Sequence, residues 1–143
     1  MGENNTELTN LPIPWDGVRN AVKYLPRFEK PGFFFGRWND VKVGGFPPVY
    51  WEPSKPVERF VRGLYDDGLI VTFDWPSWDY GKELGPNHEA ISQLDALTCL
   101  KLLTMHVRAD RFTEGHLSCV FEDGTIASIL RRLRELLATA ETE

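Results

Sequence analysis

The last part of the chain lacks proline and has very little glycine. None of the ten prolines lies beyond Pro86, and the only glycines after that point are Gly115 and Gly124. Proline interrupts helices and central strands, so its absence favours long regular elements in this part. The earlier part differs, because fifteen of the eighteen aromatic residues lie between Tyr24 and Tyr80. We therefore expect an irregular, aromatic first part and a regular second part.

Cysteine is scarce, and long apolar runs and an excess of cations are absent. The two cysteines, Cys99 and Cys119, and the lack of a signal-peptide pattern after Met1 argue against a disulfide-rich secreted domain. They predict a cytoplasmic protein with free thiols. No apolar run approaches the roughly 20 residues that cross a membrane. The net charge of -5 argues against general nucleic-acid binding, which needs a basic surface.

The length of 143 residues and the hydrophobic content of 42% are typical of one globular domain with its own core. The polar residues 1–10 are expected to form a flexible tail, and residues 11–143 a single domain. Residues 27–53 have no clear periodicity, although Phe33-Phe34-Phe35 suggests a short buried strand, and Gly44-Gly45, Pro47-Pro48 and Pro53 suggest a loop. The sequence leaves the role of this stretch open.

Apolar periodicity predicts most of the secondary structure. Spacings of three and four residues predict helices over residues 16–25, 54–66, 92–108 and 125–137. The third of these is expected to begin with the capping box Ser92–Asp95. Strands are predicted over residues 69–73 and 116–121. The sum is an α+β fold of about four helices packed on a small, mostly antiparallel sheet. The residues expected to form its core are Phe73, Leu97, Leu100, Leu103, Phe121, Ile129 and Leu133.

The segment that follows the third predicted helix holds a dense group of charged side chains. Arg108 lies in the last turn of the helix, where the helix dipole favours a cation, and Asp110, Arg111 and Glu114 follow. Two arginines and two carboxylates can build a closed network that fastens the helix to the next strand. Alternatively, one arginine is left to bind an anionic ligand. We expect Arg108 to be partly buried beside Asp110 or Asp74, and Arg111 to be more exposed.

Two histidines in the same segment suggest a second chemistry. His106 and Asp110 are four residues apart, and His116 or Glu114 could add a third ligand to give a two-histidine, one-carboxylate metal set. His106 could equally be a neutral core histidine. The strong zinc signatures are absent, as are the Gly-x-Ser-x-Gly elbow and the glycine-rich phosphate loops. We therefore expect no metal and no cofactor.

The second candidate site is the loop after the predicted strand 69–73. It contains Asp74, Trp75, Trp78 and Tyr80. Tryptophans exposed on a rigid loop would form a stacking platform or an interface anchor. The alternative is that both tryptophans pack over the core and fasten the loop that follows.

Several short strings in the second part of the chain form a recognisable pattern. They are Phe73-Asp74-Trp75, Trp78, Leu102-Leu103-Thr104, Arg108-Ala-Asp-Arg-Phe112, Glu114-Gly115, Phe121-Glu-x-Gly124 and Ile129-Leu130. Together they resemble an uncharacterised bacterial family of small cytosolic proteins, a domain of unknown function, and Arg-Ala-Asp-Arg-Phe-x-Glu-Gly is the most specific string. The resemblance covers about Phe60 to Leu137, whereas the first fifty residues show no such similarity. It implies a cytosolic α+β protein and no particular activity, cofactor or site.

Two functional hypotheses follow. The first is a non-enzymatic accessory or regulatory module that binds a protein partner or a small anionic ligand through the Trp75–Tyr80 loop, Arg108 and Arg111. Small size and acidity are compatible with an inhibitor or accessory protein of a mobile element or a defence system. The alternative is a small hydrolase-like enzyme, metal-assisted in one version. Its residues would be His106, Asp110, Glu114 and His116.

Overall fold

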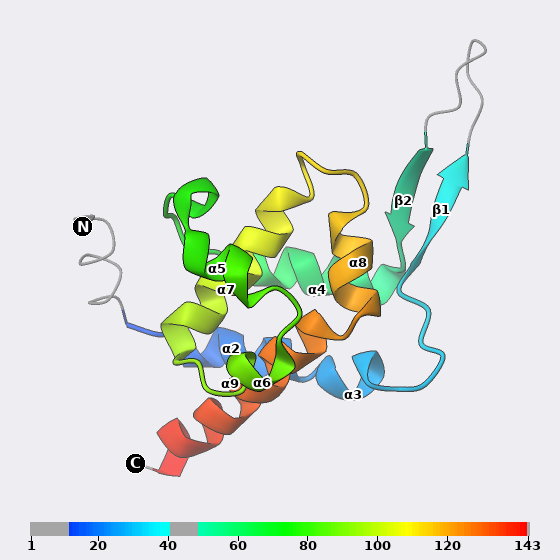
Figure 1. Cartoon of the computed structure of the whole chain (residues 1–143). Helices are drawn as coiled ribbons and strands as arrows, with labels where there is room; N and C mark the ends of the chain where they lie inside the picture. Colours follow the sequence, from blue (N-terminus) through cyan, green and yellow to red (C-terminus); the bar gives the residue numbers. More distant parts are fainter. Residues whose placement is uncertain (1–11, 41–48, 143) are drawn as a thin grey trace.

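The computed structural model of the chain describes residues 12–40 and 49–142, and it is mostly helical (Figure 1). Its elements, in chain order, are α2 (Trp15–Val22), α3 (Leu25–Phe28), β1 (Gly36–Asp40), β2 (Val49–Pro53), α4 (Lys55–Asp66), the 3-10 helix η1 (Trp75–Ser77), α5 (Asp79–Leu84), α6 (His88–Ile91), α7 (Ala96–Ala109), α8 (His116–Glu122) and α9 (Thr125–Thr142).

The described residues contain a single sheet of two strands. β1 and β2 pair antiparallel, with Gly36 opposite Pro53 and Asp40 opposite Val49. The helices pack mainly on one another rather than on this sheet. The expected α+β fold of about four helices on a sheet is therefore wrong.

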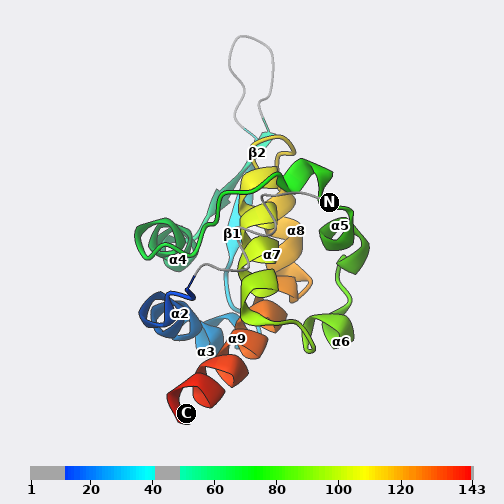
Figure 2. The same ribbon diagram turned by 90° about the vertical axis from the view of Figure 1, so that its left-hand side faces the viewer.

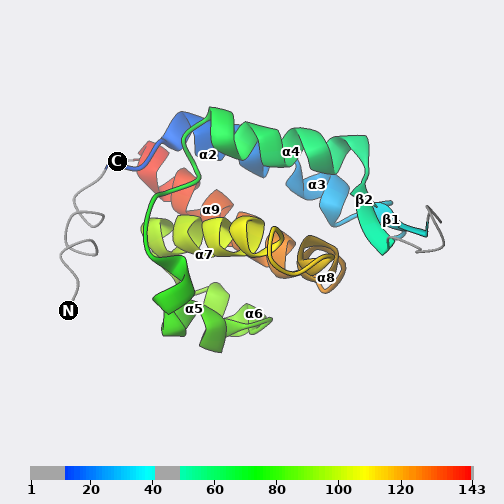
Figure 3. The ribbon, with the colours of Figure 1, turned by 90° about the horizontal axis from the view of Figure 1, so that it is seen from above.

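Helix α7 lies in the middle of the molecule (Figure 2). Helices α2 and α4 lie on one side of it and α5 and α6 on the other, as the view from above also shows (Figure 3). Helix α9 contacts α2, α3, α6, α7 and α8, so it joins the first helices to the last ones. The β1–β2 pair projects from the end of the molecule that is opposite the carboxyl-terminal end of α9 (Figure 1).

The first two predicted helices occur near the expected positions. Helix α4 begins after Ser54, buries Phe60 and Leu64, and ends before Gly68, whose φ is +73°. Glycine adopts a positive φ at little cost, which explains why the helix stops there. Helix α2 corresponds to the first part of the helix that was predicted over residues 16–25. Pro26 does not end that helix but occupies the first turn of α3, where proline leaves no intrahelical hydrogen bond unmade.

The third predicted helix, α7, begins later than expected. Asp95 is its N-cap, and its Oδ1 accepts the N–H of Thr98 at 2.8 Å. Ser92 instead follows the short separate helix α6. The expected capping box at Ser92 is therefore wrong, because Asp95 provides the same kind of cap three residues later. Helix α9 includes the whole of the fourth predicted helix.

The segment 69–73 is not a strand, contrary to the prediction. It lies against α7, where the N–H of Val71 donates to the Thr104 hydroxyl at 3.0 Å. That hydroxyl donates in turn to the Leu100 carbonyl at 2.8 Å. Its β-branched and aromatic composition suits any half-buried extended segment, and pairing also needs a neighbouring strand. Here α7 supplies the apolar surface and a side chain satisfies the backbone donor.

Residues 116–121 form α8, so the second predicted strand is also wrong. Leu117 and Phe121 are buried whereas Cys119 between them is exposed. A separation of four residues fits both strand alternation and one face of a helix, so this pattern could not distinguish them. Gly115 and Gly124, with φ of +86° and +84°, flank the helix and set its ends.

The core is a cluster of buried apolar side chains drawn from α2 through α9. Of the expected core residues, Leu97 and Phe73 are only half-buried. The others belong to the cluster: Leu100, Leu103, Phe121, Ile129 and Leu133. Phe28 is the centre of a group of rings. Its neighbours are Phe33, Phe35, Phe60 and Phe121. The Phe33–Phe35 segment thus contributes to the core without forming the expected strand.

In the ranges 12–40 and 49–142, no helix is both long enough and apolar enough to cross a membrane. The expected flexible tail, residues 1–10, and the first part of the expected loop, Gly44-Gly45 and Pro47-Pro48, lie outside the described residues. Pro53, which was also expected in that loop, instead ends β2.

Candidate functional site

The acidic residues at the carboxyl-terminal end of α7 accept hydrogen bonds from the backbone. Asp110 Oδ1 accepts the N–H of Leu117 at 3.0 Å. This N–H lies in the first turn of α8, so Asp110 satisfies a donor that the helix itself leaves unpaired. Glu114 Oε2 accepts the N–H of Trp51, on β2, at 3.2 Å. Neither carboxylate forms an ion pair with another described residue, so the expected closed network does not form.

The turn between α7 and α8 contacts the sheet at Gly115. A Cβ at this position would overlap the indole ring of Trp38, on β1. Glycine is therefore favoured at position 115 for two reasons: the indole ring leaves no room for a side chain, and the positive φ is unfavourable for other residues. With the Glu114–Trp51 hydrogen bond, this contact fastens both strands to the turn. Sequence reasoning missed it, although the glycine was part of the most specific string.

His106 and His116, both expected at a site, lie together in the structure. His106 Nδ1 is 2.9 Å from His116 Nε2. The ring centroids are 5.2 Å apart, and the ring planes differ by 25°. Two rings whose facing nitrogens are this close have their centroids this far apart only when both nitrogens lie on the line between the centroids. The rings therefore meet edge to edge. The two nitrogens therefore share one proton in an N–H···N hydrogen bond between α7 and α8.

Burial keeps both rings neutral. It lowers the pKa of His106 to about 4, and His116 adds to the effect. Burial also lowers the pKa of His116, although Asp110 and Asp123 oppose this change. His106 Nε2 is buried with no hydrogen-bond partner among the described residues. A bare ring nitrogen is less costly there than an unpaired N–H, so the geometry favours His106 Nδ1 as the donor.

These contacts do not assemble the expected catalytic set. A metal shared by His106 and His116 would need their lone pairs to converge on one point, whereas the two nitrogens face each other. Asp110 and Glu114 hold backbone donors instead, and no three His, Cys, Asp or Glu of the described residues are grouped to hold a metal ion. Burial raises the pKa of the Cys99 thiol to about 12, which makes it a poor nucleophile. The geometry gives the hydrolase-like alternative no support.

Arg108 has an aromatic neighbour rather than the expected carboxylate. It is half-buried, as predicted, and its guanidinium carbon lies 5.7 Å from the ring centroid of Tyr65 on α4. Arg111 is exposed, also as predicted. Neither arginine has a carboxylate within ion-pair distance in the part of the chain that the structure describes. The expected pairing of Arg108 with Asp110 or Asp74 is therefore wrong.

The aromatic loop divides into a packed part and an exposed part. Trp78 is half-buried, meets the ring of Phe73 edge-on at 5.4 Å, and has the Lys101 ammonium 4.6 Å from its ring centroid. Trp75 packs instead on Phe112, at 5.9 Å between centroids. The side chains of Asp74 and Tyr80 are exposed. Both tryptophans are half-buried and pack against the core, and Trp75 also lies beside the turn that carries Arg111.

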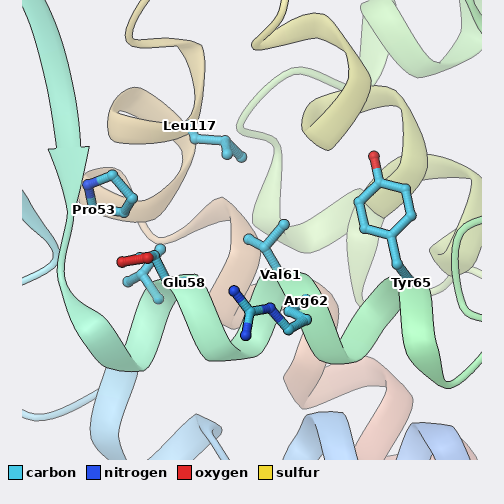
Figure 4. Close-up of a pocket in the computed structure, with 7 residues that line it drawn as sticks. Pro53, Glu58, Val61, Arg62, Tyr65 and Leu117 are labelled. Atoms are coloured by element: carbon cyan, nitrogen blue, oxygen red, sulfur yellow. The ribbon is translucent and has the colours of Figure 1, made fainter.

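An apolar groove lies between α4 and α8 next to Arg108 (Figure 4). Its volume is about 360 Å³. Leu117 on α8 points across the groove toward Val61, and Tyr65 stands at the α7 end. The lining residues are Pro53, Val57, Glu58, Val61, Arg62, Tyr65 and Leu117. Sequence reasoning missed the groove, because it placed Leu117 in a strand rather than on a helix that faces α4.

Residues 15–139 match a family of unknown function, DUF6508. The chain belongs to this family. No curated protein and no solved structure matches the chain significantly. The expectation of an uncharacterised family is thus confirmed, and the DUF6508 match also includes the aromatic first part, where we saw no resemblance. The DUF6508 description names no activity, so a functional proposal must rest on the geometry of the site.

Proposed function

We propose that this DUF6508 domain is a non-enzymatic binding module that recognises an acidic segment of a partner protein. The contact surface, called here the arginine surface, lies at the carboxyl-terminal end of α7. It consists of Trp75, Arg108, Arg111 and Phe112. The observation that carries the proposal is the combination of two arginines without a described carboxylate partner and a phenylalanine whose exposed fraction is 79%.

The neighbouring acids leave these cations available. Asp110 and Glu114 direct their carboxylates to the backbone N–H groups of Leu117 and Trp51. On α9, by comparison, Arg131 is paired with Glu29 and Arg132 with Glu135, whereas the exposed Arg134 has no carboxylate within ion-pair distance among the described residues. Arginine and large aromatic side chains dominate the energetics of protein interfaces. A partner carboxylate could therefore pair with an arginine fork while an apolar side chain covers Phe112.

The setting proposed for this function is the cytoplasm of a bacterial cell. Cys99 and Cys119 are not bonded to each other, which fits a reducing compartment. The narrower proposal, an inhibitor or accessory protein of a mobile element or a defence system, rests on small size and acidity alone.

A displayed library of random twelve-residue peptides tests the proposal. Selection on the purified full chain should enrich peptides that carry Asp or Glu beside an apolar residue. Replacing both Arg108 and Arg111 by glutamine should weaken the binding of the selected peptides at least tenfold. Arg134→Gln, at an exposed position of α9, is the matched control and should leave binding unchanged. Enrichment of peptides without acids, or equal binding by the double variant, would contradict the proposal.

A further inference from the structure

The groove between α4 and α8 has the size and lining of a small-molecule site. Its volume of about 360 Å³ falls within the range of roughly 300–1,000 Å³ that small-ligand pockets occupy. Val57 and Val61 from α4, Leu117 from α8 and Pro53 from β2 contribute apolar surface. Burying an apolar ligand against such surface is favourable because it removes apolar area from water.

Charge is distributed unequally along the groove. Glu58 lies toward the β2 end, 3.6 Å from the Lys55 ammonium, so its charge is partly compensated. Arg62 also lines the groove and has no carboxylate within ion-pair distance in the ranges 12–40 and 49–142. Arg108 adds a second cation at the Tyr65 end, over the ring of that residue. The Arg62 guanidinium points toward the Glu58 side in Figure 4, so Arg108 is the cation that makes the Tyr65 end favour an anionic group.

We propose that the groove binds a small carboxylic acid with an apolar body. The body lies between Val61 and Leu117, and the carboxylate accepts hydrogen bonds from Arg108 at the Tyr65 end and from Arg62, whose exposed side chain turns toward that end when the acid binds. A monoanion suits the groove better than a phosphate dianion, because Glu58 would repel the second charge. The inference shares only Arg108 with the proposed protein-binding surface.

Titration of the full chain with octanoate tests the inference, with octan-1-ol and octylamine as matched probes of the same length. Calorimetry should show octanoate binding at least tenfold more tightly than either probe. Amide NMR shifts should change along α4 and at the start of α8. Arg62→Gln should weaken octanoate roughly tenfold, the factor that corresponds to about 1.4 kcal/mol. Arg59→Gln, at an exposed position of the same helix outside the groove lining, should have no effect.

A variant that fills the groove provides an independent test. Val61→Trp should abolish octanoate binding and leave selected acidic peptides bound, whereas Arg111→Gln should do the reverse. These two variants separate failure of the groove proposal from failure of the protein-binding proposal. If Val61→Trp does not fold, Arg62→Glu gives the same test at an exposed position. Equal binding of octylamine, or amide shifts confined to other elements, would overturn the inference.

A further titration, with a peptide, distinguishes a small acid from the carboxyl terminus of a peptide chain as the ligand. An acetylated Val-Leu dipeptide with a free carboxyl end should bind more weakly than octanoate, because its polar amides would be buried without partners. Tighter binding of the dipeptide acid, lost on amidation, would replace the small-acid proposal with recognition of a chain terminus.

Discussion

The two parts of α7 differ in how their polar groups are satisfied. From Leu102 to Val107 every residue is buried, and the Thr104 hydroxyl and His106 Nδ1 have hydrogen-bond partners, whereas His106 Nε2 has none among the described residues. Beyond that stretch, Arg108 and Arg111 lack a described carboxylate partner. Both parts contain polar side chains, so polarity alone does not distinguish structure from function. Whether a polar group finds its partner within the molecule is the more useful criterion.

The largest expected effect tests the buried part of α7. Leu103 is fully buried in the core, so Leu103→Ala should lower the free energy of unfolding by about 2–5 kcal/mol. Urea unfolding followed by circular dichroism measures this loss. Arg134→Ala, on the exposed face of α9, should change the free energy by no more than about 0.5 kcal/mol. An unchanged urea midpoint for Leu103→Ala would show that α7 does not pack as described.

Lowering the pH tests the buried His106–His116 pair, which lies where the two parts of α7 meet. The folded state keeps His106 neutral down to about pH 4, whereas the unfolded chain takes up a proton near pH 6.5. The unfolded state binds more protons in this window, so stability is full above about pH 6.5 and falls as the pH approaches 4. The loss should reach on the order of 3 kcal/mol. His116, Asp110 and Asp123 are the titratable groups that act on this pair.

Unfolding at a series of pH values, for the unmodified chain and for His106→Gln, measures this contribution. The variant should lose less stability between pH 6.5 and 4, because carboxylate titration is common to both proteins. His88→Gln, at an exposed histidine, is the control and should follow the unmodified chain. Parallel curves for His106→Gln and the unmodified chain would rule out the neutral buried pair.

A smaller effect is expected at the cap of α8. Asp110→Ala removes the acceptor for the Leu117 N–H and should cost about 1 kcal/mol. Asp110→Asn keeps an acceptor oxygen and should recover most of this loss. Thermal unfolding of both variants provides the measurement. Equal losses for Ala and Asn would mean that the charge of Asp110, rather than its hydrogen bond, stabilises the turn.

The smallest effects on stability are expected at the arginine surface. Arg108→Gln removes only a cation–π contact with Tyr65, worth about 0.5–1 kcal/mol. Arg111→Gln, at an exposed position, should change stability by at most about 0.5 kcal/mol. Urea unfolding checks both. A loss of several kcal/mol for Arg108→Gln would reveal a buried ion pair and make this surface structural.

Much of the helical structure could be predicted from local patterns. The positions of α4 and α9 follow from apolar spacing on one helix face, and that of α7 from a long apolar stretch that is buried on most sides. The segments 69–73 and 116–121 could not be assigned correctly, because both were compatible with a half-buried strand. The deciding groups, the Thr104 hydroxyl for the first and the Asp110 cap for the second, act through the folded structure. Apolar periodicity contains no information about such partners.

The positions of several candidate residues could be predicted, whereas their contacts could not. The helix-dipole argument placed Arg108 correctly at the end of α7, yet it could not identify Tyr65 as its neighbour. His106 and His116 were expected together, and they meet as a hydrogen-bonded pair rather than as metal ligands. The bond from Trp51 to Glu114 spans 63 residues of sequence. Pairs so far apart have no local pattern from which a single sequence could reveal them.

The contact between Trp38 and Gly115 makes two distant positions mutationally coupled. Any side chain at 115 would displace the indole ring. A smaller residue at 38 would remove the collision, but the strain of a positive φ would remain. Compensation therefore works in one direction. A smaller side chain at position 38 restores part of the stability that a substitution at 115 removes, whereas no substitution at 115 restores the stability lost with the tryptophan. A combinatorial library at these two positions should consequently retain glycine at 115 even where the tryptophan has gone.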